Sequence, residues 1–370
     1  KQGAEVNVIM TANAVNFINP ITFETLTGRK CLVDTFDRNF EFQVEHVSLA
    51  KKADLVMIAP ASANVIGKMA GGIADDMLTT TVLACDCPKL AAPAMNTRMY
   101  ENPATRENLE TLRRHGFTLV EPEEGFLACG DVGKGKLANE EVILDYLEAV
   151  IGAEKDFNGQ RVLVTAGPTR EALDPVRFLT NHSTGKMGYA IAKAAFLRGA
   201  KVTLVTGKTE TPKPRFVDVV EVVSARQMYE AVMSRASEQD ILIMAAAVAD
   251  YRPQNIAAEK IKKMDGDSVL PLERTDDILA SAGAARRPGQ FLCGFSMETE
   301  HMLENSRKKL ETKNIDMIVA NNLRQEGAGF GVDTNIVTLI TKDSEESLPM
   351  LSKDEVAMKI LDAIAARIKE

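Results

Sequence analysis

The segment from Pro93 to Pro103, PAMNTRMYENP, gathers an amide, two methionines and a tyrosine in one short stretch. Proline at both ends excludes a continuous helix or a central strand across the segment, so we expect a shaped loop. In such a loop Asn96 could offer its amide to a ligand. Methionine is also a general filler of core gaps, so a surface turn with packed methionines explains the segment equally well.

Cys129 is a second chemical candidate, in the sequence FLACGDVGKGKLA. The glycines suit a mobile flap that could close a thiol over a ligand, and the nearby lysines would favour its thiolate. Cysteine is more often a small buried hydrophobe, which would put Cys129 at the root of a loop. A P-loop is not expected, because Leu137 stands where a Ser or Thr must meet magnesium.

His46 is expected at the start of a helix, where the macrodipole disfavours the charged imidazole. A neutral His46 could act as a hydrogen-bond partner or base, or it could only cap or pack the helix. Ser62 and Asn64, in APASAN, follow a predicted strand at its carboxyl end. Open α/β sheets bind ligands at that edge, so both side chains are candidate ligand contacts.

The second half of the chain contains a long polar connection, VTAGPTREALDPVRFLTNHSTGKMG. Long polar loops in compact domains are usually functional. Gly185 and Gly188 open the next helix, and we expect both to let phosphate approach its amide groups.

Acidic and basic residues follow the connection. Asp250 is expected at the carboxyl end of the strand DILIMAAAVAD, and Lys260 comes soon after in EKIKK. An acid at a strand end with lysines nearby suits phosphates and a divalent metal, although the lysines could be a solvated charge run. Lys309 and Lys313 are four apart on one predicted helix face and could present two cations together, or could simply be exposed.

The elements that must position these residues alternate between strand and helix. Strand-like runs are EVNVIM, ADLVMIAPA, KLAAPAM, RVLVTAG, KVTLVTG, FVDVVEVV, DILIMAAAVAD, FLCGF, NIDMIVANN and NIVTLIT. Apolar runs separated by helices are typical of parallel strands buried on both faces. The sequence therefore predicts an α/β protein with two doubly wound, mostly parallel Rossmann-like domains.

A polar, turn-rich segment, IGAEKDFNG, follows a predicted helix and marks the boundary between residues 1–151 and residues 159–370. GAEVNVIMT from Gly3 resembles GAKVTLVTG from Gly199, which follows a strand, a loop and an apolar-faced helix. The first domain starts at this repeated segment, so we expect it to lack an opening strand, its first glycine-type loop and most of its first helix.

The composition of the chain argues against several classes of protein. The 370 residues carry a net charge of -8 and no long basic run, so a nucleic-acid or membrane-surface role is poorly supported. Five cysteines match neither a disulfide framework nor zinc-ligand spacing, which favours a reducing cytoplasm. No apolar run approaches the roughly 18 residues of a membrane span.

In combination these motifs resemble, over nearly the whole chain, the bacterial bifunctional family that fuses phosphopantothenoylcysteine decarboxylase to phosphopantothenate-cysteine ligase in coenzyme A synthesis. PAMNTRMYENP looks like the P-x-M-N-x-x-M signature of flavin-dependent cysteine decarboxylases, and APASAN, His46 and ACGDVGKGKLA follow in the expected order. NHSTGKMG, AAAVADYRP and EKIKK look like ligase signatures.

For the first domain the resemblance implies FMN, which oxidises the substrate thiol so that the carboxylate can leave. Asn96 would contact the substrate carboxylate, His46 would assist the first step, and Cys129 would donate the proton that completes reduction. Thr11, Ser62 and Asn64 would contact FMN, together with the absent first loop, which puts FMN retention in question.

For the second domain the resemblance implies that CTP activates 4'-phosphopantothenate as an acyl-cytidylate before cysteine displaces CMP. Asn181 would handle the acyl-cytidylate, and Mg2+ would act through the nucleotide phosphates. The CTP contacts would be Met244, Ala245, Ala246, Asp250, Lys260, Asp276, Asp277, Ile278, Leu279, Phe295, Lys309 and Lys313. The family also implies a homo-oligomer, with trimers of the flavin domain and dimers of the ligase domain.

Three alternatives were weighed against this interpretation. A protein that only binds or modifies FMN, such as a flavin prenyltransferase, would lack residues after Gly159. A dehydrogenase with two dinucleotide domains would need G-x-G-x-x-G after RVLVTAG, and the sequence has none there. A regulatory flavoprotein without activity would tolerate loss of Asn96 and Cys129, yet both are present.

Overall fold

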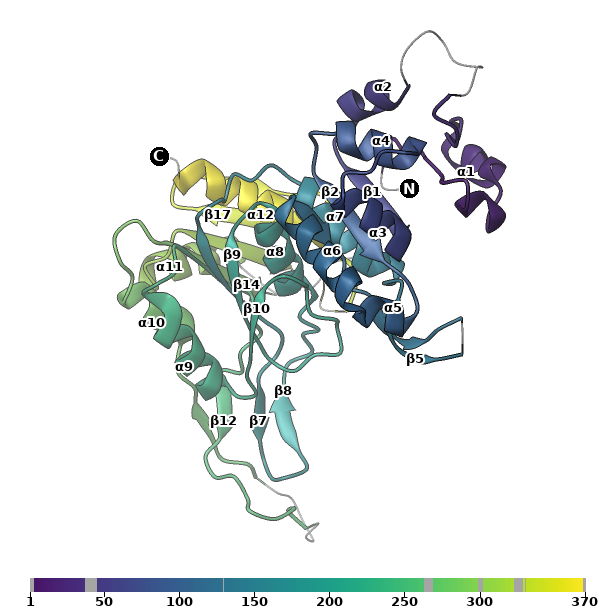
Figure 1. Cartoon of the computed structure of the whole chain (residues 1–370). Helices are drawn as coiled ribbons and strands as arrows, with labels where there is room; N and C mark the ends of the chain where they lie inside the picture. Colours follow the sequence, from purple (N-terminus) through teal and green to yellow (C-terminus); the bar gives the residue numbers. More distant parts are fainter. Residues whose placement is uncertain are drawn as a thin grey trace. The chain divides into compact units, whose positions relative to one another are not determined.

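The computed structural model describes residues 3–36, 45–128, 130–262, 269–298, 302–322, 329 and 331–368. The chain divides into two compact units, Lys1–Gly152 and Ala153–Glu370, which are coloured purple to blue and teal to yellow in Figure 1. Within the described ranges, none of the helices has the length and apolar content that a membrane crossing requires.

A parallel three-stranded sheet forms the centre of the first unit, in the order β1-β2-β3. Its strands are β1 (Val56–Ala61), β2 (Lys89–Pro93) and β3 (Phe117–Leu119). Apolar side chains of α3 (Ala63–Ala70) and α6 (Pro103–Arg114) pack in one core cluster, and those of α7 (Glu140–Ile151) pack in another. Two separate clusters of this kind are typical of helices on both faces of a doubly wound sheet.

The other elements of the first unit are η1 (Ala14–Asn16), α1 (Pro20–Thr27), α2 (Glu45–Lys52), α4 (Met77–Ala84), α5 (Thr97–Glu101), β4 (Glu123–Phe126) and β5 (Val132–Lys136). The predicted strand over residues 5–10 is wrong. Only Ile9 pairs, in one isolated bridge to Leu32. A strand needs a hydrogen-bonded neighbour along its length, and this apolar run has none among the described residues.

An eight-stranded sheet forms the second unit, in the order β10-β9-β6-β11-β14-β15-β17-β18. Its strands are β6 (Arg161–Ala166), β9 (Lys201–Thr206), β10 (Asp218–Glu221), β11 (Ile241–Met244), β14 (Phe291–Glu298), β15 (Met317–Asn322), β17 (Val337–Thr341) and β18 (Glu345–Ser347). β17 and β18 are antiparallel to their neighbours and the rest are parallel, so the prediction of a mostly parallel sheet is confirmed.

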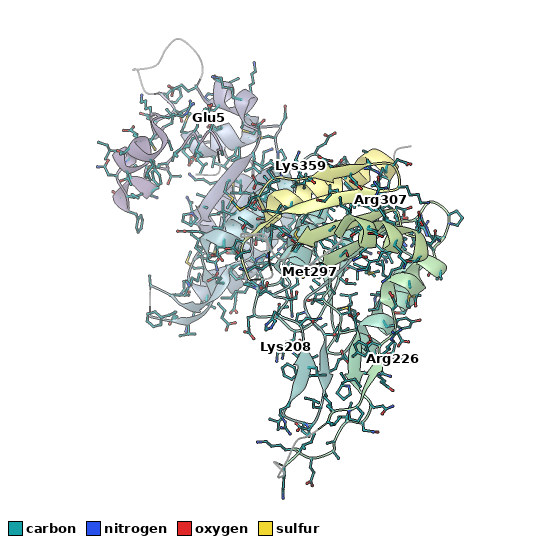
Figure 2. All side chains as sticks on the ribbon, turned by 180° about the vertical axis from the view of Figure 1, so that it is seen from behind. Glu5, Lys208, Arg226, Met297, Arg307 and Lys359 are labelled. Atoms are coloured by element: carbon teal, nitrogen blue, oxygen red, sulfur yellow. The ribbon has the colours of Figure 1, made fainter. Side chains whose placement is uncertain are left out.

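Helices cover both faces of this sheet. One face packs against α8 (Lys186–Leu197) and α12 (Lys353–Ile368). The other packs against α9 (Ala225–Ala236), α10 (Ile278–Ala284) and α11 (Met302–Thr312). In Figure 2, seen from behind, Arg226 of α9, Arg307 of α11 and Lys359 of α12 lie on the outer surface.

Gly188 has a role besides the predicted one. A Cβ atom at this position would lie 2.5 Å from the Ala166 Cβ and 2.9 Å from the Thr165 carbonyl oxygen. The missing side chain therefore lets α8 pack closely on β6, a role that the sequence did not indicate, and the phosphate approach expected at Gly188 stays a prediction. Gly185 fits its prediction better, because it caps α8 with a φ of +79° that favours glycine.

Short antiparallel pairs complete the second unit. They are β7 (Arg170–Ala172) with β8 (Phe178–Thr180), β12 (Tyr251–Pro253) with β13 (Leu272–Arg274), and β16 (Thr334–Asn335) with β19 (Leu351–Ser352). β7 and β12 lie side by side, and Figure 1 shows β7, β8 and β12 together at one end of this unit. We call β7, β8, β12, β13 and their turns the arm.

Candidate active sites

In the first unit, the carboxyl ends of β1 and β2 bring the predicted ligand contacts to one sheet edge. The Ala94 amide donates to the Ala61 carbonyl at 3.1 Å, which ties the two strand ends together. Ser62 then caps α3 by accepting from the Val65 amide at 3.4 Å. Asn64 is exposed in the first turn of α3, and Asn96 follows β2. Ser62, Asn64 and Asn96 are therefore positioned by adjacent strand ends.

Asn96 connects β2 to the β4–β5 hairpin. Its side-chain oxygen accepts from the Arg98 amide at 2.9 Å, and its side-chain nitrogen donates to an Asp131 carboxylate oxygen at 2.9 Å. The capped segment Thr97–Glu101 is the short helix α5, so the prediction of a loop without regular structure is wrong here. The flanking prolines exclude a longer helix but leave room for one turn.

Two glycines let the β4–β5 hairpin approach Asn96. A Cβ at Gly133 would lie 2.7 Å from the Thr97 hydroxyl, and one at Gly135 would lie 2.3 Å from the Met95 carbonyl oxygen. The Met95 amide also donates to the Gly135 carbonyl at 3.0 Å. Only glycine permits this contact. Cys129, predicted on the same flap, lies outside the described residues.

A charged cluster fixes the hairpin from the other side. Glu121 accepts from Lys134 at 2.9 Å, from Arg113 at 3.1 Å and from the Tyr100 hydroxyl at 3.4 Å. Burial by itself would raise the pKa of Glu121, but the Lys134 hydrogen bond and the two cations hold it below the usual value. Glu121 is therefore a stable anion that joins β5, α5 and α6.

The positions of Thr11 and His46 say less about their roles. The Thr11 hydroxyl accepts from the amide of Ala14, the first residue of η1, at 3.2 Å. His46 lies in the first described turn of α2, which precedes β1 as predicted and packs on α4.

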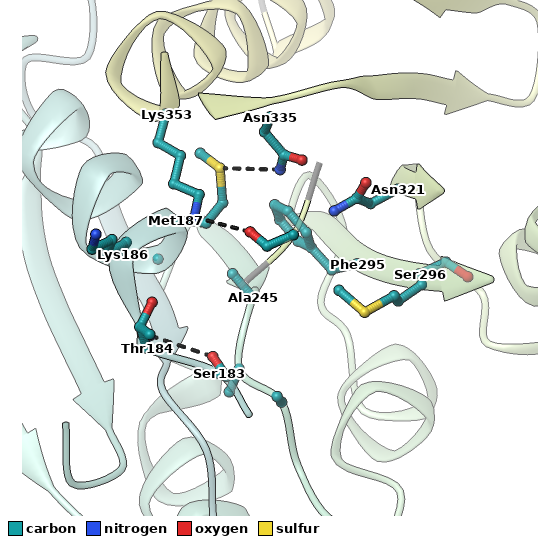
Figure 3. Close-up of a pocket in the computed structure, with 16 residues that line it drawn as sticks. Ser183, Thr184, Lys186, Met187, Ala245, Phe295, Ser296, Asn321, Asn335 and Lys353 are labelled. Carbon is teal, nitrogen blue, oxygen red and sulfur yellow. Dashed lines mark hydrogen bonds between the residues drawn. The ribbon is translucent and has the colours of Figure 1, made fainter. Parts of the chain in front are cut away.

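In the second unit, a pocket of about 140 Å³ lies at the carboxyl ends of the central strands (Figure 3). The predicted residues Ala245, Ala246 and Phe295 line it. Its other lining residues are Ser183, Thr184, Gly185, Lys186, Met187, Gly188, Ala247, Ser296, Met297, Asn321, Gly329, Asn335 and Lys353. Met244 is buried in the core below the pocket.

Two lysines enter the pocket from the first residues of α8 and α12. The Lys186 amine pairs with the Asp333 carboxylate at 2.6 Å. The buried Lys353 amine donates to the Gly329 and Val332 carbonyls. Burial, and then the neighbouring Lys186 charge, lower the pKa of Lys353. Sequence reasoning missed both lysines, because a lysine in the first turn of a helix is ordinarily exposed.

Asn321 is a further residue that sequence reasoning missed. It lies at the end of β15, it is only 5% exposed, and its side-chain oxygen has no hydrogen-bond partner among the residues that the structure describes. Figure 3 shows it at the pocket, near Phe295 of the adjacent strand. An unpaired buried oxygen is costly unless a ligand donates to it. The signal was present, because NIDMIVANN ends a buried strand with two amides.

Asn181 reaches the wall of the pocket. Its side-chain nitrogen donates to the Ala247 carbonyl at 3.0 Å and to the Val248 carbonyl at 3.2 Å. The Ala246 amide in turn donates to the Thr165 hydroxyl at 3.1 Å. The Asn181 bonds fix the segment that follows β11 against the segment that precedes α8, and the Thr165 bond fixes it to β6.

Other predicted nucleotide contacts lie around α10 and α11. Lys309 donates to the Ser296 hydroxyl at 3.1 Å, one contact away from the pocket. Lys313, just past the end of α11, pairs with Asp277 at 2.9 Å, and Asp277 caps α10. The other predicted contacts here are Asp276, Ile278 and Leu279. Asp276 pairs with Arg226, Ile278 is buried, and Leu279 packs against Gly294. None of these α10 residues lines the pocket.

Asp250 and Lys260 belong to the arm. β11 ends at Met244, so Asp250 is not at its carboxyl end as predicted; it directly precedes β12, and its carbonyl accepts from the Thr275 amide at 3.0 Å. The apolar run continues past Met244, but its backbone turns to meet Gly167 and Thr169. Lys260 is exposed between β12 and β13, and neither residue lines the pocket.

Comparison with known proteins shows which family each half of the chain matches. The Flavoprotein family model matches residues 1–152, and the model of the DNA/pantothenate metabolism flavoprotein C-terminal domain matches residues 157–368. The coenzyme A biosynthesis bifunctional protein of Bacillus subtilis is 48% identical over 372 residues, which cover 100% of this chain and 91% of the relative. The chain belongs to this bifunctional coenzyme A biosynthesis family.

Further relatives agree with this family assignment. The bifunctional protein of Escherichia coli K12 is 40% identical, over 100% of this chain and 92% of its own length. A crystal structure of the C-terminal domain of such a bifunctional protein matches with a TM-score of 0.51 and 44% identity, over 58% of this chain and 99% of that domain. The prediction of a bifunctional decarboxylase and ligase of coenzyme A synthesis is therefore confirmed at the level of the family.

Proposed function

We propose that the chain catalyses two steps of coenzyme A synthesis, one in each half. Residues 159–370 join 4'-phosphopantothenate to cysteine using CTP. Residues 1–151 then decarboxylate the 4'-phosphopantothenoylcysteine with FMN. The observation that carries the proposal is that one chain matches both family models in this order and aligns along its whole length with bifunctional relatives.

The residues at the ends of β1 and β2 fit FMN. Ser62 and Asn64 are exposed polar groups beside the first turn of α3, and the unpaired amides of a helix N-terminus attract phosphate. Thr11 is the third proposed contact. Bound FMN would accept two electrons from the substrate thiol and so allow CO2 to leave an otherwise unactivated carboxylate.

Three residues of the first half have proposed roles on the substrate. Asn96 donates its amide to the substrate carboxylate, and its bond to the Asp131 carboxylate supports this role because the same donor already holds a carboxylate. His46 assists the first step. Cys129 gives the proton that completes product formation. Cys129→Ser should therefore stop phosphopantetheine formation and leave pyrophosphate release unchanged.

In the second half the pocket receives the reacting groups of CTP and 4'-phosphopantothenate. The substrate carboxylate attacks the α-phosphorus of CTP, the bond to pyrophosphate breaks, and an acyl-cytidylate forms. The cysteine amine then attacks the acyl carbon, and CMP leaves with the bonding electron pair. The amides at the start of α8, Lys186 and Lys353 stabilise the negative charge on the leaving phosphates.

We also propose the other contacts that the family resemblance implies. Asn181, bonded to the pocket wall, orients the acyl-cytidylate. The proposed CTP contacts are Met244, Ala245, Ala246, Asp250, Lys260, Asp276, Asp277, Ile278, Leu279, Phe295, Lys309 and Lys313. Among the described residues no three His, Cys, Asp or Glu side chains form a metal site, so Mg2+ has no assigned protein ligand and would be held by phosphate oxygens.

The proposal also covers the oligomeric state of the protein and its place in the cell. Exposed apolar residues support association of each half with other copies: Phe17, Ile21 and Leu26 around α1, and Val176, Phe178 and Leu272 in the arm. We assign trimers to the first half and dimers to the second. Four free cysteines among the described residues suit the reducing cytoplasm. Light scattering of the intact chain would measure the oligomer.

One assay tests the function directly. The full chain should release pyrophosphate continuously only when CTP, 4'-phosphopantothenate and cysteine are all present, and without cysteine it should release at most about one pyrophosphate per active site. Addition of FMN should then release CO2. Absence of pyrophosphate from the complete mixture would refute the ligase, and absence of both CO2 and any flavin absorbance would refute the decarboxylase.

A further inference from the structure

The turn between β7 and β8 holds the segment that carries Lys260. The Ala257 amide donates to the Leu173 carbonyl at 3.0 Å. Four residues later, the Ile261 amide donates to an Asp174 carboxylate oxygen at 3.1 Å, and the Ile261 carbonyl accepts from the Arg177 guanidinium at 2.9 Å. Lys260 therefore lies between two anchored points and directly precedes one of them.

Asp174 is the centre of this attachment. Its side chain is fully buried and accepts from the Val176 amide at 2.8 Å, from the Arg177 amide at 2.9 Å and from the Arg177 guanidinium at 2.9 Å, besides the Ile261 amide. A buried carboxylate is costly unless its lone pairs are satisfied. These bonds join the turn between β7 and β8 to the backbone at Ile261.

We propose that Asp174 is a positioning residue for the ligase reaction, which acts by fixing the backbone beside Lys260 so that the exposed Lys260 amine meets a phosphate group of the nucleotide. The inference rests on the proposed function, because it takes Lys260 as a phosphate contact. Successive Cα atoms are about 3.8 Å apart, so the bonds at Ile261 set the origin of the Lys260 side chain. A misplacement of about 1 Å at a reacting site can cost up to about a hundredfold in rate.

Loss of the Asp174 charge would release Lys260 without removing it. Asp174→Asn keeps the size of the side chain but weakens its bonds to the Arg177 guanidinium. The Arg177 contact with the Ile261 carbonyl then loses its orientation, because Asp174 holds the same guanidinium. Glu273→Gln is the matched control: it alters another carboxylate–arginine pair of the arm, with Arg252 at 2.7 Å, that does not contact residues 257–261.

A double-mutant cycle on the full chain tests the proposal. We would measure pyrophosphate release and the KM for CTP in the wild type, Asp174→Asn, Lys260→Met and the double variant. Asp174→Asn should lower kcat/KM about tenfold in the wild-type background and less than twofold in the Lys260→Met background. An equal loss in both backgrounds, or no loss in the wild-type background, would overturn the positioning role.

A second readout separates positioning from folding. Amide exchange over residues 254–262 should become at least tenfold faster in Asp174→Asn and stay unchanged in Glu273→Gln, while decarboxylation by the first half stays normal. Unchanged exchange contradicts the inference. If Asp174→Asn does not fold, Arg177→Lys loses the contact to the Ile261 carbonyl and should show the same faster exchange. Full activity of Lys260→Met would overturn the role of Lys260 and this inference with it, whereas wild-type protein without pyrophosphate release would overturn the proposed function itself.

Discussion

The side-chain amide of Asn96 donates a 2.9 Å hydrogen bond to the carboxylate of Asp131, across the contact between the end of β2 and the β4–β5 hairpin. Asn96 is the residue that we assign to the substrate carboxylate. An internal carboxylate therefore holds the amide that the substrate needs. Binding of the substrate must exchange one carboxylate for the other.

This relationship predicts that Asp131→Asn tightens substrate binding. An exposed hydrogen bond to a charged group is worth about 1 kcal/mol, so the KM for 4'-phosphopantothenoylcysteine should fall about fivefold. Affinity for the product, which has no carboxylate, should not change. Steady-state decarboxylation kinetics with product inhibition measure both quantities. An unchanged or higher KM would show that Asp131 does not compete with the substrate.

Gly135→Ala should disable the first half selectively. The added Cβ would lie 2.3 Å from the Met95 carbonyl oxygen, at a φ of +141° that L side chains rarely adopt. The hairpin must move away from Asn96, and we expect decarboxylation to fall about a hundredfold while ligation persists. Gly125→Ala in β4 is the control, because its Cβ meets only Lys136 at an ordinary 3.6 Å. Equal activity of the two variants would contradict the account.

Asn321→Leu should separate stability from function. Replacing an unpaired buried polar group by an apolar one is neutral or stabilising, so the free energy of unfolding should stay equal or rise by up to about 1 kcal/mol. The KM for CTP should rise about tenfold, because the ligand loses its partner. Urea unfolding and ligase kinetics measure the two effects. A stable variant with a normal KM would remove Asn321 from the site.

The pH dependence of stability should report Asp174. The Arg177 guanidinium is the main group that holds the pKa of the Asp174 carboxyl far below its ordinary value of 3.8. A group whose pKa is lowered on folding contributes stability above its unfolded pKa and loses it as the pH falls through the folded value. The stability difference between wild type and Asp174→Asn should therefore be constant from pH 5 to 8 and shrink only below about pH 3.8. A difference that disappears by pH 5 would contradict this assignment.

Thiol reactivity should follow burial. Burial is the main cause that raises the pKa of Cys85 to about 11, and it raises the pKa of the fully buried Cys293 further. Among the four cysteines that the structure describes, iodoacetamide at pH 8 should label the half-buried Cys87 first and leave Cys293 unlabelled until urea is added. Peptide mass spectrometry gives the order. Early labelling of Cys293 would show that the core of the second unit opens.

The sequence predicted those parts of the fold that local pattern determines. Continuous apolar runs located β1, β2 and every strand of the large sheet except β18, and the apolar face of α8 lies in its core as expected. Residues 5–10 have the same apolar pattern but no strand partner among the described residues. The antiparallel direction of β17 depends on tertiary connection, which an apolar run does not encode.

Some residues of the candidate sites could be predicted from the sequence and others could not, for a similar reason. Ser62 and Asn64 follow a buried strand, so their place at a sheet edge could be read from the pattern. Phe295 lies within β14, and only the family resemblance indicated it. Lys353 enters the pocket only because α12 packs beside α8, and these two helices are far apart in the sequence. Asp250 was misplaced because an apolar run continues beyond the last paired residue of β11.

The central claim is that one chain holds two separate active sites that work in sequence. It is tested most directly by measuring pyrophosphate and CO2 from a single preparation of the wild type and of Asn96→Leu, each supplied with FMN, CTP, 4'-phosphopantothenate and cysteine. We predict equal amounts of both products from the wild type, and from Asn96→Leu pyrophosphate alone with accumulation of 4'-phosphopantothenoylcysteine. Release of CO2 at the wild-type rate by Asn96→Leu, or failure of the wild type to release pyrophosphate, would contradict the account.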